Sequence, residues 1–301
     1  MHGKIIAGLA LAASLGIAQP SLAAPDWKAV AQALGKSGTE APGGVYRVGL
    51  PRSDLKVTLD GVELKPALAL GSWLAFKPGG DHDAMVMGDL VLTVPEIDPV
   101  MMKLIESGIE ITALHNHLQR AQPETMYMHV LGHGDPEKLA AALHTALQQS
   151  GTPLSDAPAS AAAASKAIDL DTQTIDQALG HKGKVNGGVY QVSIARAETI
   201  KDDGMEVPDA MGSAIAINFQ PTGNGKAAIT GDFVLIASEV NPVLRALRES
   251  GIEVTAVHNH MLDDQPRLFF MHFWANDDVG KLAKGLKLAL DQVHLRTGSG
   301  L

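Results

Sequence analysis

The sequence predicts an α+β protein built by tandem duplication, in which two α/β modules with mainly antiparallel sheets are related by a pseudo-two-fold axis. The first observation is a segment that occurs twice: residues 109–133 read IEITALHNHLQRAQPETMYMHVLGH, and residues 252–276 read IEVTAVHNHMLDDQPRLFFMHFWAN. The second is a glycine turn that leads into an alternating strand pattern, GGVYRV at 43–48 and GGVYQV at 187–192. Because both signatures recur in the same order, the repeat spans nearly the whole chain.

The N-terminal residues have the composition of a signal peptide. Lys4 precedes an uncharged run over residues 5–18, and Ser21-Leu22-Ala23 places small residues at the recognition positions of a cleavage site. We therefore expect cleavage after Ala23 and export to the periplasm or beyond the cell. The chain then divides into four parts, which are a signal peptide at 1–23, a first α+β repeat at 26–149, a linker rich in Ala, Ser and Pro at 150–167, and a second α+β repeat at 168–296.

Each half is expected to begin and end with a helix and to carry a further helix between its strands. The first helices are Asp26–Leu34 and Thr172–Leu179, and a glycine follows each. The middle helices are expected to start at an N-cap followed by proline, Asp98-Pro99 and Asn241-Pro242, and the last helix of the first half starts at Asp135-Pro136. The expected strands besides those of the glycine turns are 56–59, 62–70, 73–77, 84–93, 109–117 and 125–131, then 204–208, 214–220, 227–237, 252–260 and 268–274.

Composition narrows the class of protein. A chain of 301 residues with 46% hydrophobic and 4% aromatic content is globular, with aliphatic cores. The formal net charge of −9 argues against nucleic-acid binding, because neutralising phosphates requires clustered Lys and Arg. The absence of cysteine excludes a thiol nucleophile and a disulfide framework. After the signal peptide no stretch is long and apolar enough to span a membrane, and the oligomeric state does not follow from the sequence.

Six histidines occupy equivalent positions in the two copies of the repeat. The repeat pairs His115 with His258, His117 with His260 and His129 with His272. Alternate residues of a strand share a face, so the two histidines of each HNH triplet point the same way. If the hairpin is centred near Gln122, His115 lies opposite His129 and three imidazoles converge. This is the arrangement of a site for a divalent transition metal, zinc first, with copper, nickel or iron as alternatives. Other interpretations are a hydrogen-bonded histidine cluster and a metal-free acid/base site, and one shared site or two separate sites both remain open.

The two halves differ beside the histidines. Glu124 and His133 in the first half correspond to Arg267 and Asn276 in the second. If one half performs chemistry, the first keeps the better acid/base pair, so Glu124 and His133 are the candidate catalytic residues. The alternative is that both are ordinary loop residues.

Several motifs together resemble the LppY/LpqO family, a bacterial group whose domain has no established function. They are GDLVLT at 88–93, TALHNHL at 112–118, MYMH at 126–129 and GHGDP at 132–136. The resemblance implies export and a family identity, and it covers both halves. The second half departs from the pattern after His272, which argues against an equivalent second active site.

Three functional hypotheses follow from the sequence. The first is an exported metal-binding protein that acts as a metal-dependent hydrolase, in which the ion activates water. The second is a non-catalytic envelope protein that binds a metal or a small-molecule ligand. The third is a metal-free enzyme similar to the two-histidine phosphoesterases, although His117 and His260 stand where those enzymes have Thr or Ser. Turnover that survives a chelator would favour the third.

Overall fold

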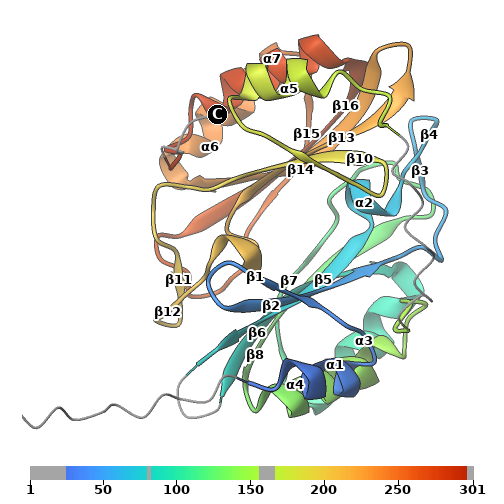
Figure 1. Cartoon of the computed structure of the whole chain (residues 1–301), viewed down its shortest axis with the longest axis vertical. Coiled ribbons are helices and arrows are strands. Elements are labelled where there is room, and N and C mark those ends of the chain that lie inside the picture. Colours follow the sequence, from blue (N-terminus) through green and yellow to red (C-terminus); the bar gives the residue numbers. More distant parts are fainter. Residues whose placement is uncertain (1–24, 80–82, 156–166, 297–301) are drawn as a thin grey trace, which may run out of the picture.

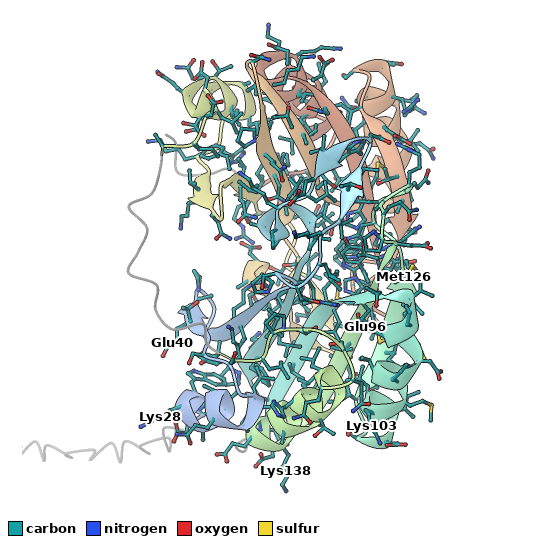
Figure 2. All side chains as sticks on the ribbon, turned by 90° about the vertical axis from the view of Figure 1, so that its right-hand side faces the viewer. Lys28, Glu40, Glu96, Lys103, Met126 and Lys138 are labelled. Carbon is teal, nitrogen blue, oxygen red and sulfur yellow. The ribbon has the colours of Figure 1, made fainter. Side chains whose placement is uncertain are left out.

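The computed structural model describes residues 25–79, 83–155 and 167–296, and it has the duplicated α+β architecture that the repeat predicts. Two six-stranded sheets face each other across the middle of the molecule, and the long helices of each half lie on the outer face of its own sheet (Figure 1). The layers are therefore helix, sheet, sheet, helix. Side chains of the outer helices such as Lys28, Lys103 and Lys138 point away from the body of the first half (Figure 2).

The first half contains helices α1 (Trp27–Leu34), α2 (Pro66–Ala69), α3 (Val94–Glu106) and α4 (Pro136–Leu147), and strands β1 (Thr39–Ala41), β2 (Val45–Pro51), β3 (Thr58–Leu59), β4 (Val62–Glu63), β5 (Gly71–Pro78), β6 (Ala84–Thr93), β7 (Glu110–His115) and β8 (Thr125–Gly134). Its sheet has the order β1-β2-β5-β6-β8-β7, and every neighbouring pair is antiparallel.

The second half contains helices α5 (Thr172–Leu179), α6 (Ala237–Glu249) and α7 (Val279–Leu290), the 3₁₀ turn η1 (Asp209–Met211), and strands β9 (Lys184–Asn186), β10 (Val189–Ile194), β11 (Lys201–Asp202), β12 (Met205–Glu206), β13 (Ile215–Gly223), β14 (Lys226–Ile236), β15 (Glu253–His258) and β16 (Leu268–Asp278). Its sheet has the order β15-β16-β14-β13-β10-β9, which repeats the order of the first sheet.

The segment from β6 to β7 forms a β-α-β unit, and β8 lies between its two strands in the sheet. Strands β6 and β7 both pair antiparallel with β8, so they are parallel to each other, and α3 crosses between them. Strands β14, β16 and β15 repeat this arrangement around α6. The unit places β7 and β15 at the sheet edges, where each leads into the histidine-bearing loop.

Two expectations about local structure are wrong. Helix α3 begins at Val94 and not near Pro99, because Thr93 and Glu96 form a capping box ahead of it, and Pro99 lies inside the helix. Helix α6 likewise contains Pro242 and starts at Ala237. The expected strand at 62–70 is replaced by the short strand β4 and by α2, because Pro66 at its first position favours a helix start.

A buried arginine in each half ties a loop to the start of the middle helix. The Arg52 guanidinium donates to the carbonyl of Val91 at 2.6 Å and to the Glu96 carboxylate at 2.9 and 3.0 Å. Arg196 makes the equivalent bonds to the carbonyl of Val234 and to Glu239. The same glutamate that caps the helix therefore neutralises the buried cation, which fixes the strand that precedes each helix.

The halves interlock through polar and apolar contacts. The backbone N–H of Lys65 donates to Gln220 Oε1 at 2.8 Å, and Gln220 Nε2 donates back to the carbonyl of Glu63 at 2.8 Å. Arg120 of the first half forms an ion pair with Glu253 of the second at 2.8 Å. An apolar core that contains Tyr127 and Trp274 fills the space beside them. The faces that carry the histidines are thus held against each other.

Within the described ranges, none of the helices has the length and apolar character needed to cross a membrane. The expected signal peptide at 1–23 and most of the expected linker, residues 156–166, lie outside the described residues.

Replacing Asp135 by alanine is expected to lower the free energy of unfolding by about 0.5 to 2 kcal/mol. Its carboxylate accepts a hydrogen bond from the backbone N–H of Lys138 at 2.9 Å and so caps α4. Urea denaturation measures the effect, and Asp278→Ala, which removes the corresponding cap of α7, should cost a similar amount. The control is Glu40→Ala, an exposed position on β1. Equal stabilities for the Asp135 and Glu40 variants would contradict the capping role.

Candidate metal centre

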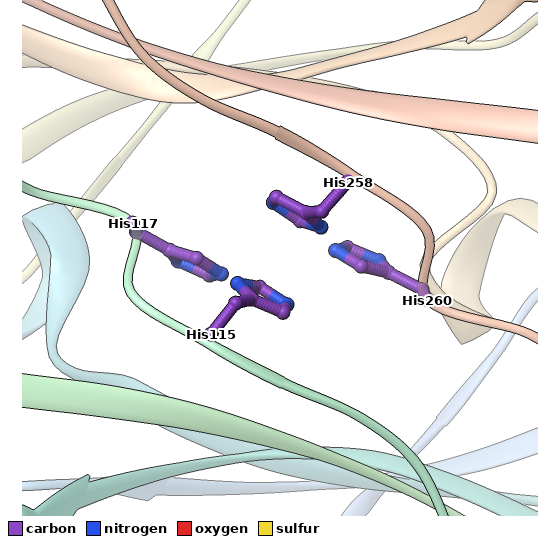
Figure 3. A group of neighbouring side chains, drawn as sticks. All are labelled: His115, His117, His258 and His260. Carbon is purple, nitrogen blue, oxygen red and sulfur yellow. The ribbon is translucent and has the colours of Figure 1, made fainter.

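Six histidines from the two halves meet between the facing sheets and form one shared cluster. It contains His115, His117, His129, His258, His260 and His272, and is called the histidine cluster below. The shortest separations between ring centroids all cross from one half to the other. They are 3.5 Å for His115 with His258, 3.6 Å for His117 with His272, and 3.7 Å for His129 with His260. Figure 3 shows His115 and His117 facing His258 and His260 with their rings nearly parallel.

The expected pairing within one hairpin is wrong, although the rings still converge. His115 lies opposite Tyr127, and the residue opposite His129 is Ala113, because the hairpin is centred near Ala121 and not near Gln122, which displaces the pairing by two residues. His115 and His129 therefore still lie on the same face of the sheet. The strand also ends at His115, so His117 lies in the following loop.

The backbone of each histidine loop is anchored by a threonine of the other half. Thr112 Oγ1 donates to the carbonyl of His260 at 2.6 Å, and Thr255 Oγ1 donates to the carbonyl of His117 at 2.6 Å. The loop rings are also supported from the side, since the Tyr127 ring stacks on His117 with a centroid separation of 3.4 Å. Each threonine lies at a register shift, Thr112 between Ile111 and Ala113 and Thr255 between Val254 and Ala256, so the irregular part of each edge strand joins the halves.

Two aspartates that sequence reasoning missed border the histidine cluster. Asp89 of β6 lies opposite His129 in the sheet, and Asp232 of β14 lies opposite His272. The Oδ1 to Nε2 distances are 3.8 Å and 3.5 Å, respectively. A signal for them is present in the sequence, because a Gly-Asp pair interrupts an apolar strand at the same place in both halves. A buried carboxylate in a sheet needs a partner, and here it faces imidazoles.

Burial controls the protonation of the cluster. It lowers the pKa of His115 to about 4 and that of His258 to about 3. Burial also lowers the pKa values of the other four histidines well below their usual range, and repulsion between the neighbouring imidazoles adds to the effect. The rings are therefore neutral at neutral pH, which is the form of imidazole that binds metals. Burial raises the pKa of Asp89 to about 8 and that of Asp232 well above its usual range.

Nine buried polar atoms of the cluster and its aspartates have no hydrogen-bond partner among the described residues. They are Nε2 of all six histidines, Nδ1 of His258, and Oδ1 of Asp89 and Asp232. Such atoms are rare in folded proteins because each one costs about 1 to 3 kcal/mol of desolvation. A hydrogen-bonded histidine cluster would satisfy these atoms internally. Their concentration in one place fits a metal ion, whose bonds to nitrogen and oxygen would satisfy them.

The ligand atoms form three groups, each within a span of 4.8 Å. The central group has only imidazoles, and two flanking groups each combine one carboxylate with two imidazoles. They are His115, His117, His258 and His260; Asp89, His117 and His129; and Asp232, His260 and His272. His117 and His260 belong to two groups each, so the central and flanking groups compete for them unless both ring nitrogens are used.

Comparison with known protein families finds the same duplication. A family model described as a domain of unknown function, DUF1259, matches residues 28–149 and again residues 173–292. The chain belongs to the DUF1259 family. Each match contains one histidine triplet and one aspartate of the site, so each DUF1259 repeat supplies half of the candidate metal centre.

Among solved structures, the DUF1259 chain is similar to a trimeric bacterial microcompartment shell protein, PduB, with 12% identity over 86% of this chain and 91% of that chain and a TM-score of 0.22. It is also similar to EtuB from Clostridium kluyveri, with 11% identity over 86% of this chain and 90% of that chain and a TM-score of 0.20. No curated protein matches the chain.

The structure places Glu124 and His133 outside the three ligand groups of the DUF1259 centre. Glu124 is exposed in the loop just before β8. His133 is exposed near the other end of β8, where it lies opposite Met85. It is four positions along the strand from His129, a distance of about 13 Å. The catalytic role of these two residues stays a prediction.

Proposed function

We propose that this DUF1259 protein is an exported metal-binding protein similar to the LppY/LpqO family, with its histidine cluster and two aspartates holding divalent transition metal ions. The observation that carries the proposal is the set of nine buried and unpaired ligand atoms at the interface of the repeats. A site of this kind is costly to the metal-free fold, and metal binding would offset that cost.

The donor set favours zinc among the transition metals. Imidazole nitrogen and carboxylate oxygen are ordinary zinc ligands, and the chain has no thiolate to offer. Copper, nickel and iron accept imidazole as well and remain the alternatives. In the central group, His115, His117, His258 and His260 would hold the ion, and in the flanking groups Asp89 or Asp232 would add a carboxylate.

If the protein is an enzyme, we propose that it is a metal-dependent hydrolase. A bound ion would supply Lewis-acid activation of water or of a substrate oxygen. The chain would contribute the positioned imidazoles, the sheets that limit the access of solvent, and the buried carboxyl groups of Asp89 and Asp232 beside the rings. The alternative is a non-catalytic protein that binds a metal or a small ligand in the envelope, and a hydrolysis screen with the metal-loaded protein separates the two.

The metal-free phosphoesterase alternative is supported by one contact, since His272 Nδ1 lies 2.8 Å from the carbonyl oxygen of Gly231 and its Nε2 atom has no hydrogen-bond partner among the described residues. The unpaired atoms of the other rings and of both aspartates favour the metal instead. Export rests on the signal-peptide pattern of residues 1–23 and on the family resemblance.

Elemental analysis of untagged protein tests the proposed function. After incubation with zinc and removal of excess ion by gel filtration, the protein should retain about one or more equivalents of zinc per chain. A preparation that stays metal-free under zinc, copper, nickel and iron would contradict the proposal.

If the protein is a hydrolase, Glu124→Gln is expected to lower turnover by about 10²- to 10⁴-fold, because it removes a general base without removing a metal ligand. His133→Asn tests the candidate acid in the same way. Both variants should keep the metal content of the wild type. The matched control is Arg267→Gln, which changes the corresponding position of the second repeat. Unchanged turnover for Glu124→Gln at equal metal occupancy would remove Glu124 from the chemistry.

A further inference from the structure

Two of the cavities that border the histidine cluster reach it at equivalent places, but they differ greatly in volume. The larger has a volume of about 700 Å³ and reaches the cluster at His117 and His272. The smaller has a volume of about 20 Å³ and reaches it at His129 and His260, which the repeat pairs with His272 and His117. The larger cavity also extends over residues of both repeats.

The difference in volume follows from substitutions between the repeats. Trp73 and Met87 line the small cavity, and the residues at the corresponding places, Ala216 and Thr230, line the large one. Trp73 also lines the large cavity, so the exchange confined to one cavity each is that of Met87, which narrows the small one, and Thr230, which leaves the large one open. Trp73 is also closely packed where it meets η1, since a Cβ atom added to Gly212 would lie 3.1 Å from the indole ring. The duplication has therefore kept one cavity and closed the other.

The large cavity contains one cationic side chain, Arg47, among the described residues that line it. The guanidinium lies over the Trp73 ring at 4.1 Å and donates to the backbone carbonyl of Ala210. No carboxylate of a described residue forms an ion pair with it. Burial lowers the pKa of Arg47 to about 10, so the side chain still carries its charge at neutral pH. The equivalent residue of the second repeat is the neutral Gln191.

A buried carboxylate lines the same cavity without pairing with this cation. Asp89 is 8% exposed, and its Oδ1 atom has no hydrogen-bond partner among the described residues. The cavity thus has a guanidinium without a direct ion pair, although it interacts electrostatically with Asp89, and metal-ligating atoms of Asp89, His117 and His272 without hydrogen-bond partners among the described residues. A ligand that contacts both sets of groups needs an anionic group to pair with Arg47 and a second polar group that faces the metal-ligating atoms.

We propose that the large cavity binds a small organic anion, with its carboxylate or phosphate group against Arg47 and its other end at the His117 and His272 side of the metal centre. This inference rests on the proposed function and names the class of ligand that the site takes. The guanidinium recognises carboxylate and phosphate by the same paired hydrogen bonds, so the two anionic groups are alternatives within one chemistry.

Calorimetric titration of the zinc-loaded protein with succinate and with inorganic phosphate tests the proposal. At least one of the probes should bind to the wild type, and Arg47→Gln, which copies Gln191, should weaken that binding by about tenfold or more. Thr230→Met, which copies Met87, should fill the cavity and weaken the binding of succinate. All variants should retain the zinc content of the wild type, because neither position supplies a ligand atom.

Two variants serve as matched controls. Lys28→Gln removes a positive charge from the exposed outer surface of α1 (Figure 2) and should leave anion binding unchanged. Met87→Thr makes the reverse exchange in the small cavity, and this variant should also leave anion binding unchanged.

The outcomes separate this inference from the proposed function. Zinc retention without binding of either probe overturns the anion site and leaves the metal site standing. Equal affinities for the wild type and Arg47→Gln also overturn it, because the anion would then bind to the metal alone. Failure to retain zinc overturns both.

Discussion

Replacing His117 by alanine is expected to lower the zinc affinity of the protein by at least about 100-fold, because the loss of a direct ligand exceeds the 10- to 100-fold effects of its supporting residues. His117 contributes to the central ligand group and to the group of Asp89. Its ring is stacked between His272 and Tyr127, which holds it in place toward both groups. Competition with a chromophoric chelator measures the affinity.

The pseudo-symmetric variant and a remote histidine make this experiment specific. His260→Ala should cause a similar loss, because His260 has the equivalent place in the central group and in the group of Asp232. His181→Asn removes an imidazole that lies after α5 and outside the three groups, so the affinity should not change. The double variant His117→Ala and His260→Ala removes a ligand from all three groups, and an unchanged affinity in that protein would return the histidine cluster to a purely structural role.

The metal-free protein is expected to lose stability steeply as the pH falls from about 7 to about 5. In the unfolded chain the six imidazoles take up protons near pH 6.5, whereas burial lowers their pKa values in the folded state, to about 4 for His115 and about 3 for His258. A group whose folded pKa is depressed contributes stability above its unfolded pKa, and this is lost as the pH falls. Each such group changes the free energy of unfolding by about 1.4 kcal/mol per pH unit below 6.5.

The two aspartates act in the opposite direction. Burial raises the pKa of Asp89 to about 8, so this group contributes stability below its unfolded value near pH 4, and that stability is lost as the pH rises through about 8. Asp232 behaves alike. Between about pH 4 and 6.5 two carboxyl groups therefore offset two of six imidazoles, and a net uptake of about four protons on unfolding remains.

Urea denaturation of the chelator-treated protein at pH 7, 6 and 5 measures this dependence. The double variant His117→Gln and His272→Gln removes two of the titrating groups and should reduce the slope by about half. This comparison separates the cluster from the surface carboxylates, which both proteins share. A free energy of unfolding that stays constant from pH 7 to pH 5 would contradict the burial of neutral imidazoles.

The repeat predicts most of the fold because each half carries its own hydrophobic periods and glycine stops. Helices α1 and α4 and strand β6 lie where the pattern places them. The start of α3 is harder to predict, since Asp98-Pro99 resembles a helix start and the capping box that decides the start is formed by Thr93 and Glu96.

The site is predictable only in part. The six histidines are visible in the sequence, but the pairing of His117 with His272 depends on how two sheets pack, which no local pattern encodes. The hairpin is also centred near Ala121 and not near Gln122, so Tyr127 and not His129 lies opposite His115, although both histidines keep the same face. The Gly-Asp pairs at Asp89 and Asp232 offer a usable signal, because an acidic residue in the middle of an apolar strand is costly unless it serves a site.

Anomalous diffraction at the zinc edge from crystals of the zinc-loaded protein tests the shared metal centre most directly. The expected result is an anomalous peak between the two repeats, bonded to nitrogens of His117 or His260 and to further ligands of the same group. Zinc peaks confined to surface residues, with none among the six histidines of a well-ordered cluster, would contradict it.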